Sequence, residues 1–299
     1  MGSATARAVD GAALARAARR LAIAPEAPWL HGEVARRMAE RLAVVRLAPA
    51  RVLDWTAHAG ASQALLRQAY PRAEIVAVEA QPPIERDAPP WWSARRWRSE
   101  ASVLAEDAVA PASAQLVWAN MMLHGVVDPG LAMQRWRAAL TVDGFLMFST
   151  LGPDTLASLR ALYRDAGWGA PHAPFTDMHD LGDMLVGAGF AEPVMDQERL
   201  TLTWATPEAL LAELRALGAN ADPARHAGLR TPRWRARLLG ALRERADAQG
   251  RIALEFEVVY GHAFNPRPRV AGVTHVTVEA LRGMARSGAG SGRRGASLG

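Results

Sequence analysis

Short apolar runs alternate with helix-like segments between residues 51 and 152, and this alternation constrains the fold more than any other feature of the chain. The runs are RVLDW (51–55), EIVAVEA (74–80), ASVLAED (101–107), AQLVWAN (114–120) and DGFLMFSTLG (143–152). Each has the length of a strand, and helical segments are predicted over 61–70 and 129–140. Strands that alternate with helices at this spacing predict an α/β fold with a doubly wound, mostly parallel sheet.

The pattern changes after residue 152. Helices are predicted over 153–167 and 177–190, and long strands over 192–204 and 251–264. Two further helices, over 207–217 and 233–248, lie between the long strands. A long strand that leaves and one that returns predict an antiparallel pair at the sheet edge, with a helical cap inserted before the last strand.

The ends of the chain differ from its centre. Helices are predicted over 11–23 and 31–46, where EVARRMAERLAVV has apolar residues at helical spacing. We expect residues 1–30 to form a lid or flexible segment and 31–266 to form the main domain, with cap helices at about 206–248. The remaining residues, 267–299, are rich in Gly, Ser and Arg and are expected to be largely disordered.

Composition excludes several classes of protein. The chain has no cysteine, which rules out disulfides, thiolate metal sites and a cysteine nucleophile. His172 and His179 have no third ligand nearby, so no metal site is expected. No run of 18 apolar residues and no secretory signal is visible, and we expect a cytoplasmic monomer that does not enter a membrane.

The charge favours an acidic partner. All 35 basic residues are arginine and the formal net charge is +5. Trp91, Trp92 and Trp97 lie among arginines and could stack on nucleic-acid bases. Packing of a surface segment against the sheet is the preferred interpretation of these tryptophans, and no nucleic-acid partner is expected.

Several later segments carry a resemblance to a known family. LVWANMMLHG corresponds to a segment of the LVWSNLALQW type, and FLMFSTLGPDTLASLR to one of the FSTFGPDTL type. FTDMHDLGDMLVGAGFAEPVMDQERLTLTW and EVVYGHAFNP match in type and order. The chain thus resembles the class I S-adenosylmethionine-dependent methyltransferases, and among them the malonyl-acyl-carrier-protein O-methyltransferases of biotin synthesis. The resemblance covers about residues 31–266 and implies a seven-stranded, Rossmann-like sheet.

The resemblance also implies a site for S-adenosylmethionine at the carboxyl ends of the strands. Asp54 ends the first strand, Gly60 is the last loop glycine, and Glu79 would accept from both ribose hydroxyls. Glu106 or Asp107 would lie near the adenine amino group, and Asn120 at the mouth of the site. Each also has a simpler interpretation: a solvated loop acid for Glu79, and a turn or cap residue for Asn120.

The cofactor loop departs from the family pattern D-x-G-x-G-x-G. Here Thr56 and His58 replace two of the three glycines. Glycine permits positive φ and close approach of the backbone to a ligand, whereas Thr56 is β-branched and poorly suited to positive φ. His58 adds a ring where the family leaves room for the cofactor. The N-terminal segment departs too, with Leu14 and Leu21 at positions where the family has aromatic residues.

Two functions therefore stay open. The first is esterification of the free carboxyl of a malonyl group on acyl-carrier protein; the second is a catalytically inactive relative that has lost the cofactor and binds a carrier protein or pathway partner. For the enzyme, His179 and Arg199 are candidates to bind the substrate carboxylate. An Arg-rich segment of the cap is the candidate surface for the acidic carrier protein, with Arg230, Arg233, Arg235 and Arg237. The simpler interpretation of that segment is a solvated helix face.

Overall fold

A computed structural model describes residues 6–46, 48–80 and 103–268 of the chain. The tryptophan cluster at 91–97 and nearly all of the predicted tail lie outside these residues. The described strands are β1 (Arg51–Trp55), β2 (Glu74–Glu79), β3 (Val103–Ala105), β4 (Ala114–Ala119), β5 (Leu140–Leu151), β6 (Ala191–Trp204) and β7 (Ile252–Phe264).

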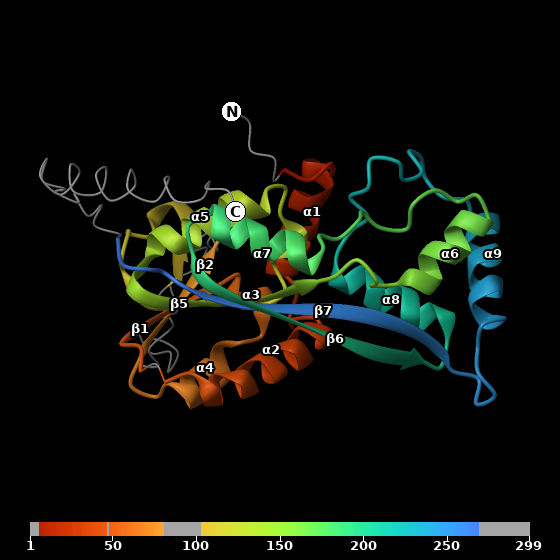
Figure 1. Cartoon of the computed structure of the whole chain (residues 1–299). Helices are drawn as coiled ribbons and strands as arrows, with labels where there is room; N and C mark the ends of the chain where they lie inside the picture. Colours follow the sequence, from red (N-terminus) through yellow and green to blue (C-terminus); the bar gives the residue numbers. More distant parts are fainter. Residues whose placement is uncertain (1–5, 47, 81–102, 269–299) are drawn as a thin grey trace, which may run out of the picture. The chain divides into compact units, whose positions relative to one another are not determined.

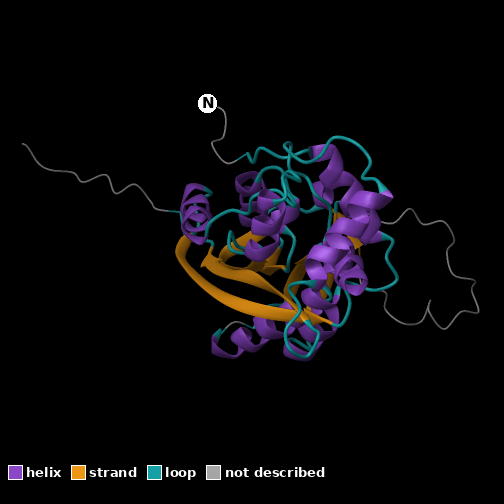
Figure 2. Ribbon diagram, turned by 90° about the vertical axis from the view of Figure 1, so that its right-hand side faces the viewer, coloured by secondary structure: helices purple, strands orange, loops and turns teal. Residues whose placement is uncertain are grey.

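Helices connect these strands on both faces of the sheet (Figures 1 and 2). The α-helices are α1 (Gly11–Ala22), α2 (Trp29–Arg41), α3 (Ala57–Gly60), α4 (Gln63–Ala69), α5 (Pro129–Ala139), α6 (Ala157–Asp165), α7 (Met178–Gly187), α8 (Pro207–Leu217) and α9 (Pro232–Arg243). Short 3-10 turns occupy η1 (Leu42–Val44), η3 (Glu106–Ala108) and η4 (Leu123–Gly125).

The sheet order is β3-β2-β1-β4-β5-β7-β6. β1 to β5 pair in parallel, whereas β7 is antiparallel to both β5 and β6. This confirms the predicted α/β class, the antiparallel pair at the edge and the helical cap before the last strand. Because β1, β2 and β4 are parallel neighbours, their carboxyl ends meet at one edge, where the predicted cofactor residues lie.

Alternating side chains of the central strands divide the core in two. In β4, Leu116 and Trp118 pack with α2 and α4 on one face, while Val117 packs with α5 and α7 on the other. Every second side chain of a strand points to the same face, so a strand covered on both sides reads as one continuous apolar run. This is why AQLVWA has no polar alternation.

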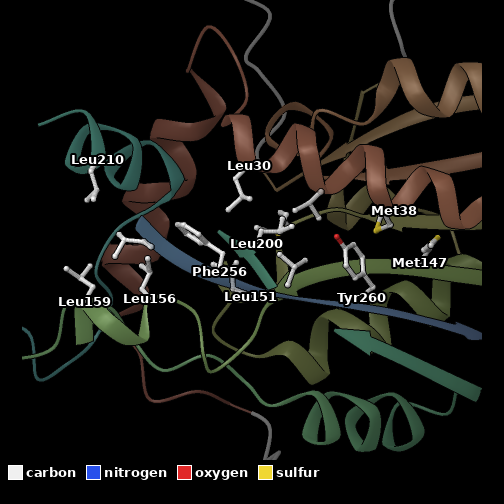
Figure 3. Close-up of a cluster of buried hydrophobic side chains, with 14 of the residues drawn as sticks. Leu30, Met38, Met147, Leu151, Leu156, Leu159, Leu200, Leu210, Phe256 and Tyr260 are labelled. Atoms are coloured by element: carbon white, nitrogen blue, oxygen red, sulfur yellow. The ribbon is translucent and has the colours of Figure 1, made fainter. Parts of the chain in front are cut away.

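The cap is joined to the core rather than separate from it. Leu156, Leu159 and Leu210 gather around Phe256 of β7, and Leu30 of α2 lies in the same cluster (Figure 3). The ends of β6 and β7 extend beyond β5 and carry this packing, so the long edge strands hold the cap helices against the N-terminal helices.

Some predicted helices end or break differently in the structure. The helix predicted over 31–46 begins at Trp29 and ends at Arg41, and the turn η1 follows it. The segment 61–70 forms only α4, because Ala61 has φ of 55° and separates it from α3. The helix predicted over 233–248 ends at Arg243. There Asp247 accepts hydrogen bonds from the backbone N–H groups of Gln249 and Arg251, which builds a turn in place of a last helical turn.

Gly261 of β7 gives a test of this packing. A Cβ at Gly261 would overlap the Phe148 ring, and it would lie 3.0 Å from Met195 Sδ. We expect Gly261→Ala to lower the free energy of unfolding by about 1–3 kcal/mol, because Phe148 is fully buried and cannot move away. The matched control is Gly240→Ala in α9, where an added Cβ meets nothing within 4 Å. The control should raise the free energy of unfolding by about 0.5–1 kcal/mol. Urea titrations measure both variants. Equal changes in the free energy of unfolding for the two variants would show that Gly261 is not needed for packing against Phe148.

Candidate active site

The loop that follows β1 has a glycine-like backbone at Thr56, where the family has a glycine. Thr56 lies in the left-handed region with φ of 59° and ψ of 45°. Its backbone N–H donates to the carbonyl of Val78 at 2.7 Å, which fixes the loop to the end of β2. A non-glycine residue held there costs on the order of 1–3 kcal/mol, so the surrounding structure must offset this strain.

Hydrogen bonds from outside the loop supply that support. His31 of α2 has its Nδ1 2.7 Å from the carbonyl oxygen of Ala59. The Asn120 side-chain amide donates to the carbonyl of Gly60 at 2.7 Å and to that of His31 at 2.8 Å. Its carbonyl oxygen accepts from the Ser149 hydroxyl at 2.7 Å. Asn120, predicted as a cofactor ligand, thus has both halves of its side-chain amide engaged in holding the loop against α2.

His58 connects the loop to two other segments. Its backbone N–H donates to Glu79 Oε1 at 2.9 Å. Its ring Nε2 lies 3.0 Å from the carbonyl oxygen of Ala24, in the linker between α1 and α2. The imidazole is exposed and points toward this linker. His58 thus connects the loop to β2 on one side and to the N-terminal segment on the other.

The two acids that end β1 and β2 differ in their surroundings. Asp54 is fully buried, and within the described part of the chain neither carboxylate oxygen has a hydrogen-bond partner. Burial, and then the charge of Glu79, hold the pKa of Asp54 well above its usual range. Burial also raises the pKa of Glu79, while the His58 N–H lowers it. Among the described residues only Oε1 of Glu79 accepts a hydrogen bond, from the loop, whereas Asp54 is enclosed at the end of β1.

The structure separates the two candidates for the adenine contact. Glu106 accepts from the Trp55 indole at 2.9 Å and forms an ion pair with Arg135 at 3.0 Å. Asp107 is exposed and makes no such contact with the described residues. Asp107 is therefore the acid that is open to a ligand, and Glu106 is held by its neighbours.

The sequence analysis missed two histidines beside the loop. His31 is 2 % exposed, and its Nε2 has no partner in the described chain. The ring of His124 faces it edge-on, with the two centroids 6.4 Å apart. Burial lowers the pKa of His31 to about 4 and that of His124 to about 3, so both rings are neutral at pH 7. A histidine on the apolar face of a predicted helix, as in WLHGEVARRM, is the signal that could have singled out His31.

The candidate substrate residues are exposed and already have acidic neighbours. The His179 ring and backbone N–H both contact Asp177 Oδ1, at 2.9 Å and 2.7 Å, at the start of α7. Arg199 of β6 donates to Asp154 at 2.5 Å. Arg199 pairs in register with Glu257 of β7, a position level with the end of β5. The backbone of Arg199 therefore lies at the same edge of the sheet as the loop.

The arginines of the cap fall into two groups. Arg230 donates to the carbonyl of Trp168, and its guanidinium lies 4.3 Å from the centre of the Trp234 ring. Arg233, Arg235 and Arg237 are exposed on α9. Arg230 is thus part of the packing beneath α9, whereas the other three are exposed, and the guanidinium of Arg237 lies 5.7 Å from the centre of the Trp168 ring.

Residues 6–46, 48–80 and 103–268 contain no group of three or more His, Asp or Glu side chains arranged to hold a metal ion. None of their helices combines the length and the apolar character that a membrane span requires.

Comparison with known proteins gives extensive similarity to one family. The chain is 40% identical over 253 residues to the malonyl-acyl-carrier-protein O-methyltransferase of Laribacter hongkongensis, covering 80% of this chain and 84% of that protein. It is 37% identical over 249 residues to the enzyme of that name in Gallionella capsiferriformans, covering 81% and 86%. The corresponding protein of Halorhodospira halophila is 40% identical over 245 residues, covering 80% and 82%. No protein-family model matches the chain.

Solved structures with low sequence identity share the fold. The YcgJ protein of Bacillus subtilis has a TM-score of 0.51 at 12% identity, covering 79% of this chain and 99% of that one. A candidate methyltransferase of Bacillus halodurans has a TM-score of 0.50 at 14% identity, covering 79% and 100%. At this identity the likeness bears on the fold, and it agrees with the sheet order described above.

The buried His31 gives a prediction about pH. The unfolded chain protonates this imidazole below about pH 6.5, but the folded chain does so only near a pKa of about 4. The stability that neutral His31 contributes is therefore present above pH 6.5 and is lost as the pH falls toward 4. We expect the difference in free energy of unfolding between the native protein and His31→Gln to shrink by up to about 1.4 kcal/mol per pH unit in that window. Urea titrations from pH 7 to 4 measure it.

His226→Gln, at an exposed position of the cap, is the control and should show no such slope. If the free energies of unfolding of the native protein and His31→Gln change equally between pH 7 and 4, the buried His31 does not have the lowered pKa on which this prediction rests.

Proposed function

The chain belongs to the malonyl-acyl-carrier-protein O-methyltransferase family, and we propose that it transfers a methyl group from S-adenosylmethionine to the free carboxyl of a malonyl group on acyl-carrier protein, a step of biotin precursor synthesis. The observation that carries this proposal is the extent of the similarity, which covers about four fifths of this chain and more than four fifths of each relative named above. The sheet edge described above supplies the residues.

The residues at that edge suit the cofactor. Glu79 accepts one hydrogen bond from the loop and retains a carboxylate oxygen for a ribose hydroxyl. Asp107 stands open for the adenine amino group. The loop from Thr56 to Gly60 has the left-handed entry that the family's glycines normally provide. When bound, S-adenosylmethionine supplies a methyl group on a positively charged sulfur, which is a good leaving group.

The reaction requires little acid–base catalysis by the protein. A malonyl carboxylate is ionised at neutral pH, so the chain needs no general base. Its residues have to hold one carboxylate oxygen in line with the methyl group and exclude water. The absence of a catalytic triad from the sequence is consistent with this task.

Arg199 and His179 remain the candidates to bind the malonyl carboxylate. Each now contacts an acid, Asp154 and Asp177 respectively. In this proposal the substrate carboxylate replaces that acid as the partner. Arg199 is the stronger candidate because a guanidinium can hold a carboxylate with two parallel hydrogen bonds.

The carrier protein is acidic, and α9 offers a surface of matching charge. Arg233, Arg235 and Arg237 are exposed along this helix. In the described chain, no carboxylate forms an ion pair with any of the three. Such a charged face mainly accelerates and orients association.

Cofactor binding distinguishes the enzyme from an inactive relative. We expect calorimetric titration to show micromolar binding of S-adenosylmethionine, and mass spectrometry to show methylation of malonyl-acyl-carrier protein. Glu79→Gln keeps an acceptor for the His58 N–H but loses the charge, and should weaken cofactor binding roughly tenfold or more, about 1.4 kcal/mol. Glu74→Gln, at the exposed other end of β2, is the matched control and should bind normally. No binding by the folded native protein would favour the inactive relative.

Charge reversal tests the docking surface. Arg233→Glu combined with Arg237→Glu should weaken carrier-protein binding roughly tenfold at low salt, and less at high salt, because the attraction is screened. The control reverses Arg46 and Arg72, two exposed arginines near the amino ends of the strands. Surface plasmon resonance measures both. If the control pair loses as much affinity for the carrier protein, the effect comes from the net charge of the protein, and α9 is not the docking surface.

A further inference from the structure

A cavity of about 990 Å³ lies next to the candidate active site, on the far side of the α1–α2 linker residue Ala24. Its walls come from three segments: residues 20–29 around the α1–α2 linker, residues 202–204 at the end of β6, and residues 212–216 of α8. We call it the α1–α8 groove. We propose that this groove binds the phosphopantetheine arm by which a carrier protein holds its acyl group, an inference that rests on the proposed function.

The groove is lined mainly by apolar side chains, and two of the large ones are open to solvent. Ile23 is 83 % exposed and Trp29 60 % exposed, both on the linker side. Trp204 is buried at the opposite wall, where its indole donates to Glu213 Oε2 at 2.5 Å and joins β6 to α8. Apolar side chains exposed in a concave site of this volume are typical of a ligand-binding groove.

One wall of the groove touches the loop proposed to hold the cofactor. Ala24 belongs to the lining, and its carbonyl oxygen lies 3.0 Å from His58 Nε2. Two residues further along the loop, Gly60 accepts the hydrogen bond from Asn120. A flexible chain lying in the groove can therefore bring its end to the loop while its other end stays at the surface.

The arginines of the groove match the phosphodiester at one end of such an arm. Arg20 and Arg215 both line it, and neither forms an ion pair with a described acid. One terminal nitrogen of Arg20 donates to the carbonyls of both Arg215 and Gly218, which leaves the donors of its other two nitrogens for a ligand. Of the two lining acids, Glu213 is engaged by Trp204 and Glu26 is exposed in the linker. A phosphodiester suits the arginines, and the arm's methyl and methylene groups suit the apolar walls.

The groove also adjoins the proposed docking surface. Its α8 wall belongs to a helix that packs against α9, and Arg243 of α9 forms an ion pair with Glu208 of α8 at 2.6 Å. Figure 1 shows α8 between α1 and α9. A carrier protein bound to the arginines of α9 would hold its arm one helix away from the groove.

Filling the groove tests this inference. Ala212→Trp and Ala216→Trp place a ring in it from exposed positions of α8. Each should lower kcat/KM for malonyl-acyl-carrier protein roughly tenfold or more, through KM. The same variants should methylate a malonyl thioester of a short alkyl thiol, which lacks the arm, at the native rate. Arg215→Gln leaves the groove open and should raise KM for the carrier-bound substrate alone.

Ala209→Trp lies on α8 outside the groove and should behave as the native protein. An unchanged KM for carrier-bound substrate in both tryptophan variants would overturn the inference. Equal losses with both substrates would also overturn it, because they would show a supporting role for α8. If the native protein methylates neither substrate, the proposed function itself fails, and that result is distinct from a failure of the groove variants.

Discussion

The side chain of Asn120 is the interaction on which the candidate site depends. It donates to the carbonyls of His31 and Gly60, and so joins the end of β4, the first turn of α2 and the last glycine of the loop. Buried hydrogen bonds of this kind are costly to break, since a lost partner leaves a desolvated polar group. Together with the hydrogen bond from the Thr56 N–H to Val78, these neighbours hold both ends of the loop in which Thr56 has a left-handed conformation.

The sheet could be predicted from the sequence because its signals are local. Continuous apolar runs mark strands covered on both faces, and the order of strands and helices limits the topology to few choices. Positions at the carboxyl ends of strands, such as Glu79, follow directly from this arrangement. The roles of Asn120 and His31 could not be predicted, because their partners are 60 and 28 residues away in the chain. The groove was missed for the same reason: three distant segments build it.

The cap and the carboxyl edge of the parallel strands are built on different parts of the sheet. β6 and β7 extend past β5, so that α6, α8 and α9 pack on strand ends rather than on the central sheet. The residues proposed to bind the cofactor therefore lie at the end of the parallel strands, whereas α9, the surface proposed to dock the carrier protein, lies on the cap. Placement of substrate recognition on separate elements lets one fold serve different substrates.

The hydrogen bonds around the loop have a consequence for how this chain can vary. Since α2 and β4 stabilise the loop from outside, the residues at positions 31, 56 and 120 do not act independently. We expect a threonine at position 56 to be tolerated best while His31 and Asn120 keep their bonds to the loop, and a glycine there to make those bonds less important. Residues that act on one short loop in this way are expected to be energetically coupled. Among homologues they should change together, so that the same substitution in the loop is neutral in one sequence background and disabling in another.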